Sequence, residues 1–133
     1  MKEPLWLQDA VVTAIHSRQL AEHGGLDGVR DPGMLSSALA RPKNAFAYSQ
    51  PKPDISALAA AYAFAIITNH PFVDGNKRTG FVIGILFLEL NGYRFSASEE
   101  TAAQAVIALA AGTLNEAQYA AFSRANSKPA RGK

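Results

Sequence analysis

The residue types that could do chemistry are concentrated in one short stretch, His70-Pro71-Phe72-Val73-Asp74-Gly75-Asn76-Lys77-Arg78. The His70 imidazole can accept a proton near neutral pH, so it is the candidate general base. Asp74 offers a hard oxygen ligand of the kind that holds Mg²⁺ on phosphate groups. A base and a metal ligand this close together indicate a reaction at a phosphate.

The second half of the same stretch suits an anion. Gly75 permits a tight turn, and we expect Gly75, Asn76 and Lys77 to present backbone N–H groups at a helix N-terminus, where the helix dipole favours negative charge. Lys77 and Arg78 add two positive charges, and a guanidinium group matches phosphate oxygens. With the base and the metal ligand, these residues describe phosphoryl or nucleotidyl transfer to a hydroxyl group.

Each of these residues also has a structural interpretation. His70 alone could be a hydrogen-bonding histidine between helices, and Asp74 could cap the helix that follows. Lys77 and Arg78 could be a solvated pair, although cations in the first turn of a helix oppose its dipole. The combination favours chemistry more strongly than any single residue does.

Helices are expected on both sides of this stretch. The Ala-rich segment Ile55–Asn69 follows Asp54, which can cap a helix, and Pro71 disfavours helical geometry in the residue before it. A second helix, apolar almost all round, is predicted from about Asn76 to Leu90, with Asn91-Gly92 as its end. These should be the most buried helices of the fold.

The rest of the chain reads as further helices, with one brief strand-like segment. Turn and capping signals place a helix from Leu5 to about Glu22, one from Asp31-Pro32 to Pro42, one after the capping pair Ser96 and Glu99, and one after the pair Thr113 and Glu116, with strand-like residues at Tyr93–Phe95. No helical period holds between Pro42 and Asp54. We therefore predict an all-α, compact single-domain helical bundle of residues 1–126, with a flap at about 43–54 and a flexible basic tail at 127–133.

Composition excludes several classes of protein. The 133 residues suit one domain, and the absence of cysteine excludes disulfides and thiolate metal sites. The formal charge of +2 is too small to indicate direct nucleic-acid binding. The longest apolar stretch, Phe81 to Leu90, is too short to cross a bilayer, and Met1-Lys2-Glu3-Pro4 does not resemble a secretion signal. We expect a cytoplasmic protein without membrane contacts, and we assign no metal site to His16 or His23.

Two stretches carry a resemblance to a known family. His70–Arg78 resembles the signature of Fic-domain proteins, H-P-F-x-[D/E]-G-N-[G/K]-R. Gly24–Pro42 is similar to the stretch G-G-x-x-G-x-R-D-x-G-L-L-x-S-A-L-x-R-P of the Doc ("death on curing") branch, the toxins of toxin–antitoxin pairs. Lys77 stands where most Fic enzymes have Gly, and Phe81 stands where they have a second Arg.

The resemblance implies the Fic/Doc fold, with ATP and Mg²⁺ as cofactors. It implies that His70 is the catalytic base and that Asp74 holds the metal. The nucleotide would be bound by the four residues that follow, Gly75, Asn76, Lys77 and Arg78. For the Doc branch it further implies transfer of the terminal phosphate of ATP to a translation factor, a threonine of elongation factor Tu, so that translation stops.

Lys77 and Phe81 favour phosphate transfer over the AMP transfer that most Fic enzymes perform. AMP transfer to a protein hydroxyl and a non-catalytic Fic-like binding module stay open as alternatives. The resemblance also implies a cognate antitoxin whose disordered C-terminal segment folds into a groove of the toxin. We expect this groove beside the active site, lined by Phe46, Tyr48 and residues of the first helix.

Overall fold

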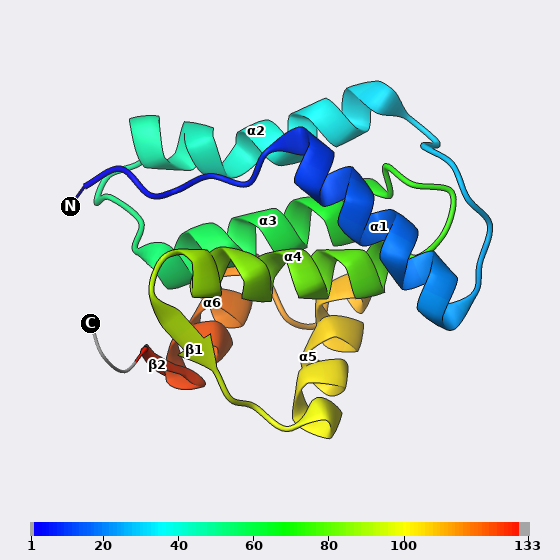
Figure 1. Cartoon of the computed structure of the whole chain (residues 1–133). Helices are drawn as coiled ribbons and strands as arrows, with labels where there is room; N and C mark the ends of the chain where they lie inside the picture. The colour runs from blue at the N-terminus through cyan, green and yellow to red at the C-terminus, as the bar shows by residue number, and fades with distance from the viewer. Residues whose placement is uncertain (1, 131–133) are drawn as a thin grey trace.

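The computed structural model describes residues 2–130 and is mostly helical, which confirms the predicted all-α class. Figure 1 shows helices α3 and α4 side by side at the centre, with α2 above them, α1 running obliquely down on the right, and α5 and α6 below. Among the described residues, no helix is long and apolar enough to cross a membrane. The elements in chain order are α1 (Asp9–His23), α2 (Pro32–Tyr48), α3 (Ile55–Asn69), α4 (Asn76–Leu90), β1 (Tyr93–Phe95), α5 (Glu99–Ala111), α6 (Glu116–Ala125) and β2 (Ser127–Pro129).

The central helices α3 and α4 approach each other closely because α4 carries glycines. A Cβ atom at Gly80 would lie 2.8 Å from Cγ1 of Ile67 and 3.2 Å from the carbonyl oxygen of Ala63. One turn further along α4, a Cβ atom at Gly84 would lie 3.3 Å from the carbonyl oxygen of Ala59. A side chain at Gly80 would therefore push the two helices apart. This packing fixes the two helix ends between which the predicted site loop is held.

Two clusters of buried apolar side chains attach the other helices to this pair. The larger cluster joins the segment before α1, helices α1 to α4 and the site loop through Leu7, Val12, Ala38, Leu39, Leu58, Ala59, Tyr62, Ala65, Ile66, Phe72, Ile83, Phe87 and Leu88. The smaller cluster joins α3, α5 and α6 through Ala60, Ala63, Ile67, Ala105, Val106, Leu109, Tyr119 and Ala120. Burial of each large apolar side chain contributes about 1.5–3 kcal/mol, so the site loop is anchored through Phe72.

Helix α2 continues through Pro42 to Tyr48, so the predicted helix end at Pro42 was wrong, as was the first half of the flap at 43–54. Proline removes one backbone donor from a helix, but packing can outweigh that loss. Pro42 is fully buried, and Phe46 packs edge-on against Trp6 with the ring centroids 5.8 Å apart. The irregular segment is therefore limited to residues 49–54.

The predicted flexible tail at 127–133 was also wrong in its first part. Ser127–Pro129 forms β2, which pairs antiparallel with β1 so that Lys128 lies opposite Arg94. The N–H group of Ala130 donates to the carbonyl oxygen of Gly92 at 2.8 Å. The strand predicted at Tyr93–Phe95 is confirmed, and residues 131–133 lie outside the described part of the chain.

Three helices begin a few residues later than predicted. For α5 and α6, the residue that caps the helix lies close to the one that was expected to do so. The caps of α5 and α6 are Ser98 and Asn115, each two residues after the expected Ser96 and Thr113. Helix α1 begins at Asp9 rather than Leu5. The backbone N–H and carbonyl groups of Leu5 are bonded instead to the Asn91 side chain, at 2.8 and 3.0 Å.

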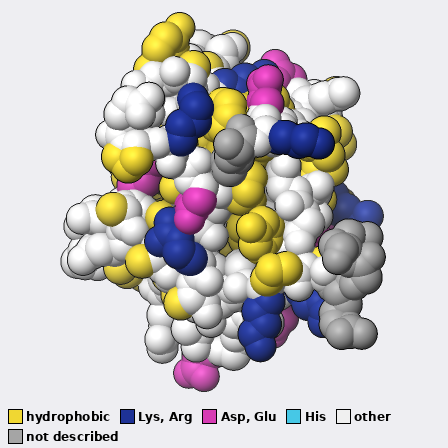
Figure 2. Space-filling view, turned by 90° about the vertical axis from the view of Figure 1, so that its left-hand side faces the viewer, with side chains coloured by type: hydrophobic (Ala, Val, Ile, Leu, Met, Phe, Trp, Pro, Cys, Tyr) yellow, Lys and Arg dark blue, Asp and Glu magenta, His cyan; other side chains and the backbone are white. Residues whose placement is uncertain are grey.

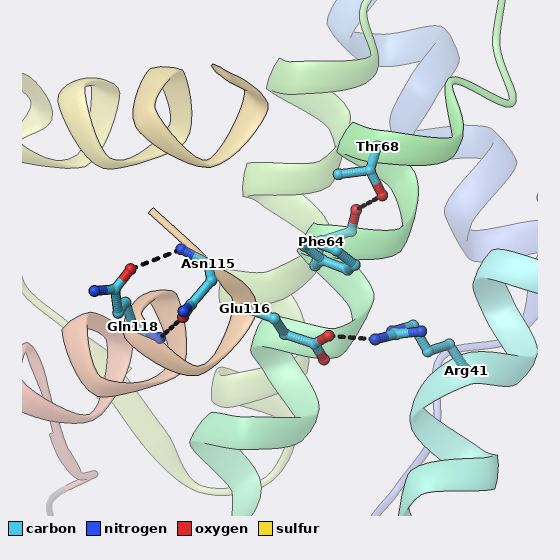
Figure 3. Close-up of polar contacts among 6 residues, drawn as sticks. All are labelled: Arg41, Phe64, Thr68, Asn115, Glu116 and Gln118. Carbon is cyan, nitrogen blue, oxygen red and sulfur yellow. Dashed lines mark hydrogen bonds and ion pairs between the residues drawn. The ribbon is translucent and has the colours of Figure 1, made fainter. Parts of the chain in front are cut away.

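Helix α6 is tied to α2 and α3 by ion pairs, one of which, between Arg41 and Glu116, is shown in Figure 3. Arg41 of α2 pairs with Glu116, and its guanidinium carbon lies 5.0 Å from the ring centroid of Phe64. At the other end of α6, Arg124 donates two hydrogen bonds to Asp54, at 2.8 and 2.9 Å. Asp54 also caps α3, as predicted. These contacts hold the C-terminal helix against the central pair.

The end of the molecule at which α3 begins and α4 ends carries an apolar strip. Figure 2 shows yellow apolar side chains in the middle of this face, with charged side chains of both signs around them. Leu5, Ile55, Leu90 and Tyr93 are among the residues that line a depression here. The predicted site residues lie at the opposite ends of α3 and α4.

The Asp54–Arg124 pair predicts an acid-dependent contribution to stability. The hydrogen bond from Arg124 is the main cause that lowers the pKa of Asp54. This contribution is complete above the unfolded-state pKa, about 3.9, and is lost as the pH falls through the folded-state pKa. Asp54→Asn keeps a capping oxygen, so it should reduce the free energy of unfolding at pH 7 by only about 0.5–1 kcal/mol.

Urea unfolding at pH 7 and at pH 2.5 measures this effect. The difference between Asp54→Asn and wild type should nearly vanish at the lower pH, and an undiminished difference there would contradict the assignment. Glu100→Gln, an exposed acid in the first turn of α5, serves as the control.

Candidate active site

The loop between α3 and α4 begins with an unusual backbone conformation. His70 ends α3 with φ 51° and ψ 54°, a left-handed geometry that few residues other than glycine adopt. Its N–H group still donates to the carbonyl oxygen of Ile66 at 3.2 Å, and Pro71 prevents the helix from continuing. The turn leaves the imidazole of His70 exposed at the end of α3.

Arg30 holds this end of the loop. Its Nε donates to the carbonyl oxygen of His70 at 2.6 Å, and its Nη2 donates to that of Asn69 at 2.8 Å. Both carbonyls lie at the C-terminal end of α3, where the helix dipole favours a cation. The backbone N–H groups of Arg30 and Asp31 both donate to the carbonyl oxygen of Pro71, at 2.7 and 3.1 Å. Sequence reasoning gave Arg30 no role in the site.

The segment that lies along the loop is residues 24–31, not the flap predicted at 43–54. Val29 forms an antiparallel bridge with Phe72, and the Val73 N–H donates to the carbonyl oxygen of Gly28 at 3.0 Å. Residues 49–54 precede the first turn of α3, whereas the loop follows its last turn. The sequence could not reveal this pairing because it joins segments about 45 residues apart.

Asn76 clamps the middle of the loop. Its side-chain oxygen accepts from the Phe72 N–H at 3.0 Å, and its side-chain nitrogen donates to the Phe72 carbonyl oxygen at 3.0 Å. Both side chains are buried, with exposed fractions of 8% for Asn76 and 1% for Phe72. The side-chain amide of Asn76 is therefore engaged in shaping the loop and is not available to a ligand.

The Asp74 carboxylate is exposed but already ordered by backbone donors. Oδ1 accepts from the Gly75 N–H at 2.9 Å, and Oδ2 accepts from the Leu26 N–H at 3.2 Å. A Cβ atom at Gly25 would lie 3.0 Å from Oδ2, so glycine at that position gives the carboxylate room. The N–H of Gly75, expected to bind an anion, is bonded to Asp74 in this structure.

His16 of α1 contacts the same loop at Phe72 and Asp74. Its Nε2 lies 2.8 Å from the carbonyl oxygen of Asp74, and its ring stacks on Phe72 with the centroids 3.7 Å apart and the planes 8° from parallel. The side chain is buried, with 2% exposed. The sequence gave no signal for this contact, because 58 residues separate His16 from Asp74.

All predicted site residues line one pocket. It has a volume of about 330 Å³ and is formed by His70, Val73, Asp74, Gly75, Asn76, Lys77 and Arg78. Helix α4 starts beside it without a side-chain cap, so the N–H groups of its first turn place partial positive charge there. Lys77 and Arg78 are exposed, and within residues 2–130 neither forms an ion pair. The pocket combines a base, a carboxylate and a strongly positive rim.

The oxygen donors in this pocket fit a metal ion that is bound partly by the protein and partly by phosphate oxygens. No cluster of three or more His, Asp or Glu that could hold a metal by itself occurs among the described residues. Asp74 is the carboxylate of the pocket, and each of its oxygens accepts one N–H group, which leaves further lone pairs. Mg²⁺ is commonly bound by one or two carboxylates together with phosphate oxygens.

A larger groove adjoins the pocket at Lys77 and Arg78. Its volume is about 560 Å³, and its apolar lining comes from α4 and α5 and includes Phe81, Val82, Ala103, Val106 and Ile107. A groove beside the active site was predicted to be lined by Phe46, Tyr48 and residues of the first helix. Gln19, Glu22 and His23 of α1 do line this groove, but the prediction was wrong for Phe46 and Tyr48. These residues lie at the far end of α2, and Phe46 packs in the core against Trp6.

Comparisons with known proteins show what the chain is similar to. The Fic/DOC family model matches residues 6–88. Over 89 residues, the chain is 35% identical to "Protein kinase doc" of Escherichia phage P1, an alignment that covers 67% of this chain and 70% of that protein. Over 74 residues, it is 39% identical to "Toxin Doc" of Mycolicibacterium smegmatis, covering 56% of this chain and 57% of that protein.

The clamp formed by Asn76 predicts a measurable loss of stability. Asn76→Ala leaves the buried N–H and carbonyl groups of Phe72 without a partner, which should lower the free energy of unfolding by about 2 kcal/mol. Denaturant unfolding measures this change, with Asn44→Ala on the exposed face of α2 as the control. A loss no larger than that of the control would show that the clamp does not shape the loop.

Proposed function

The chain belongs to the Fic/DOC family, in its Doc branch, and we propose that it is the toxin of a toxin–antitoxin pair. As such it transfers the terminal phosphate of ATP to a hydroxyl group of a translation factor. The observation that carries this proposal is the pocket, in which His70, Asp74, Lys77 and Arg78 meet at the start of α4. This set is intact, which favours an enzyme over a non-catalytic binding module of the same fold.

His70 is the proposed catalytic base. Its exposed imidazole accepts the proton of the target hydroxyl as the hydroxyl oxygen attacks the γ-phosphorus. The bond from that phosphorus to the oxygen bridging the β- and γ-phosphates breaks, and ADP leaves with the electron pair. The fixed turn at His70, held by Arg30, supports this role because a base must be well placed relative to the attacking oxygen.

The negative charge that develops on the phosphates is stabilised at the start of α4. The backbone N–H groups of its first turn, with the Lys77 and Arg78 side chains, supply preorganised positive charge. Asp74 would hold Mg²⁺, which when bound neutralises phosphate charge and orients the terminal phosphate. The backbone donors on both Asp74 oxygens keep this carboxylate in one orientation.

Two residues favour phosphate transfer over AMP transfer. Lys77 is a long cationic side chain at a position where Fic enzymes that transfer AMP usually have glycine. Phe81, where those enzymes have a second arginine, packs edge-on against Phe95 with the centroids 6.1 Å apart. The pocket therefore lacks a cation that the AMP-transferring geometry uses, and AMP transfer is the alternative that an experiment must exclude.

The proposed target is a threonine of elongation factor Tu, which would place the protein in the cytoplasm. This choice rests on the resemblance to the Doc branch, because no contact within the chain identifies the target.

The groove beside Lys77 and Arg78 supports an antitoxin partner. Its apolar lining suits an amphipathic segment that folds as it binds. Lys77 and Arg78, next to the catalytic pocket, suit acidic side chains of that segment, and Glu22 and Glu99 elsewhere in the lining suit basic ones. Ile107, one of the apolar residues that line this groove, is 60% exposed. We propose that the C-terminal segment of the cognate antitoxin binds here and covers part of the catalytic pocket.

Intact-mass analysis of elongation factor Tu after incubation with this protein, ATP and Mg²⁺ tests the proposal. We expect the mass increment of one phosphate with the wild type and none with His70→Ala, which should keep the helical circular dichroism spectrum. Thr68→Ala, on the exposed last turn of α3, should label normally because its hydroxyl bonds only within α3. Normal labelling by His70→Ala would exclude His70 as the base.

A further inference from the structure

The buried His16 contacts the catalytic loop without lining the catalytic pocket. Its side chain is 2% exposed, and the seven residues that form the pocket do not include it. We therefore expect any effect of His16 on the reaction to pass through the residues it contacts. Those residues are Phe72, on which its ring stacks, and Asp74, whose carbonyl oxygen lies 2.8 Å from Nε2.

The acceptor at this contact fixes the protonation of the ring nitrogen. A carbonyl oxygen can only accept a hydrogen bond, so Nε2 of His16 carries a proton and donates it to Asp74. The parallel stack on Phe72 holds the plane of the imidazole, which keeps this donor aimed at its acceptor. Phe72 is itself fixed by the core and by Asn76.

The bond from His16 acts on the Asp74 carboxylate through one rigid peptide group. The carbonyl of Asp74 and the N–H of Gly75 belong to the same peptide plane and point in opposite directions. When His16 holds the carbonyl, it also fixes the direction of the Gly75 N–H. That N–H donates to Oδ1 of Asp74 at 2.9 Å. Rotation of this peptide would remove this donor and leave the carboxylate held by the Leu26 N–H at Oδ2.

The neighbourhood of Gly75 keeps this arrangement tight. Gly75 has φ 77°, which glycine adopts without strain. A Cβ atom there would lie 3.4 Å from Cδ2 of Leu20 and 3.8 Å from Nε2 of His16. Helix α1 therefore packs directly against the Asp74–Gly75 peptide, and its register determines the position of that peptide.

We propose that His16 is a positioning residue for the phosphate transfer, because it orients the Asp74 carboxylate toward bound Mg²⁺ through the Asp74–Gly75 peptide. This inference rests on the proposed function for its kinetic consequences. Its structural part, the link from His16 to the Gly75 N–H, stands on the contacts alone.

Two substitutions separate the hydrogen bond from the packing. His16→Phe keeps an aromatic ring on Phe72 but has no donor, whereas His16→Gln keeps an N–H donor near the position of Nε2. Loss of an interaction that orients a metal ligand typically weakens metal binding 10–100-fold. We expect His16→Phe to raise the Mg²⁺ concentration for half-maximal transfer by at least about tenfold, with a smaller fall in kcat at saturating Mg²⁺. His16→Gln should stay within about threefold of wild type in the same Mg²⁺ titration.

The amide resonance of Gly75, followed by NMR without nucleotide or metal, provides a readout independent of activity. It should move upfield in His16→Phe, as its hydrogen bond to Asp74 is lost, and stay near the wild-type position in His16→Gln. Thr13→Ala, on the exposed face of α1, is the control for the helix and should change neither readout.

Three results would overturn the proposal: an unchanged Gly75 resonance in His16→Phe, an unchanged Mg²⁺ dependence in that variant, or equal effects of both substitutions. If His16→Phe does not fold, a rise of about tenfold in the Mg²⁺ concentration for half-maximal transfer by a folded His16→Gln also overturns the proposal, because this variant keeps the N–H donor. Absence of transfer by the wild type contradicts the proposed function instead, and the Gly75 resonance then decides the inference by itself.

Discussion

Backbone N–H and carbonyl groups at the ends of a helix and in the loop beyond it need hydrogen-bond partners outside the helix. This requirement governs the loop between α3 and α4. Three side chains from three parts of the chain meet it. Arg30 binds the carbonyls at the end of α3, Asn76 binds both backbone groups of Phe72, and His16 binds the carbonyl of Asp74. The reactive side chains stay exposed, so their positions depend on how firmly the backbone beneath them is held.

The same loop combines firm anchoring with unfavourable charge. Lys77 and Arg78 lie in the first turn of α4, where the helix dipole disfavours cations by about 0.3–1 kcal/mol each. Within residues 2–130 neither forms an ion pair that would offset this cost. The proposed triphosphate ligand would supply the missing negative charge. The buried ring of Phe72 and the glycine contacts between α3 and α4 supply the stability that this arrangement requires.

The sequence was informative where the structural signal is local. Asp31 and Asp54 cap the helices that they were expected to cap, and Pro71 ends α3 where predicted. It failed where tertiary packing overrides a local rule, as at Pro42, where burial keeps α2 intact. Strand pairing of residues 127–129 could not be predicted either, because helices α5 and α6 separate them from the partner strand in the sequence.

In the candidate site, too, local features could be predicted from the sequence and long-range contacts could not. Its reactive residues are contiguous and could be found from their types and spacing. The residues that hold the loop could not, because Arg30 and His16 lie 40 and 58 positions from the groups that they bind. A lone histidine on a helix carries no sequence signal that separates it from a core residue. Only the fold shows that it supports the loop.

The central claim is that this pocket transfers the terminal phosphate of ATP. Parallel reactions with ATP labelled at the α or the γ phosphate, with elongation factor Tu and Mg²⁺ present, test it most directly. The account predicts that label reaches the protein target from the γ position only. Label arriving from the α position would contradict it and identify AMP transfer as the reaction.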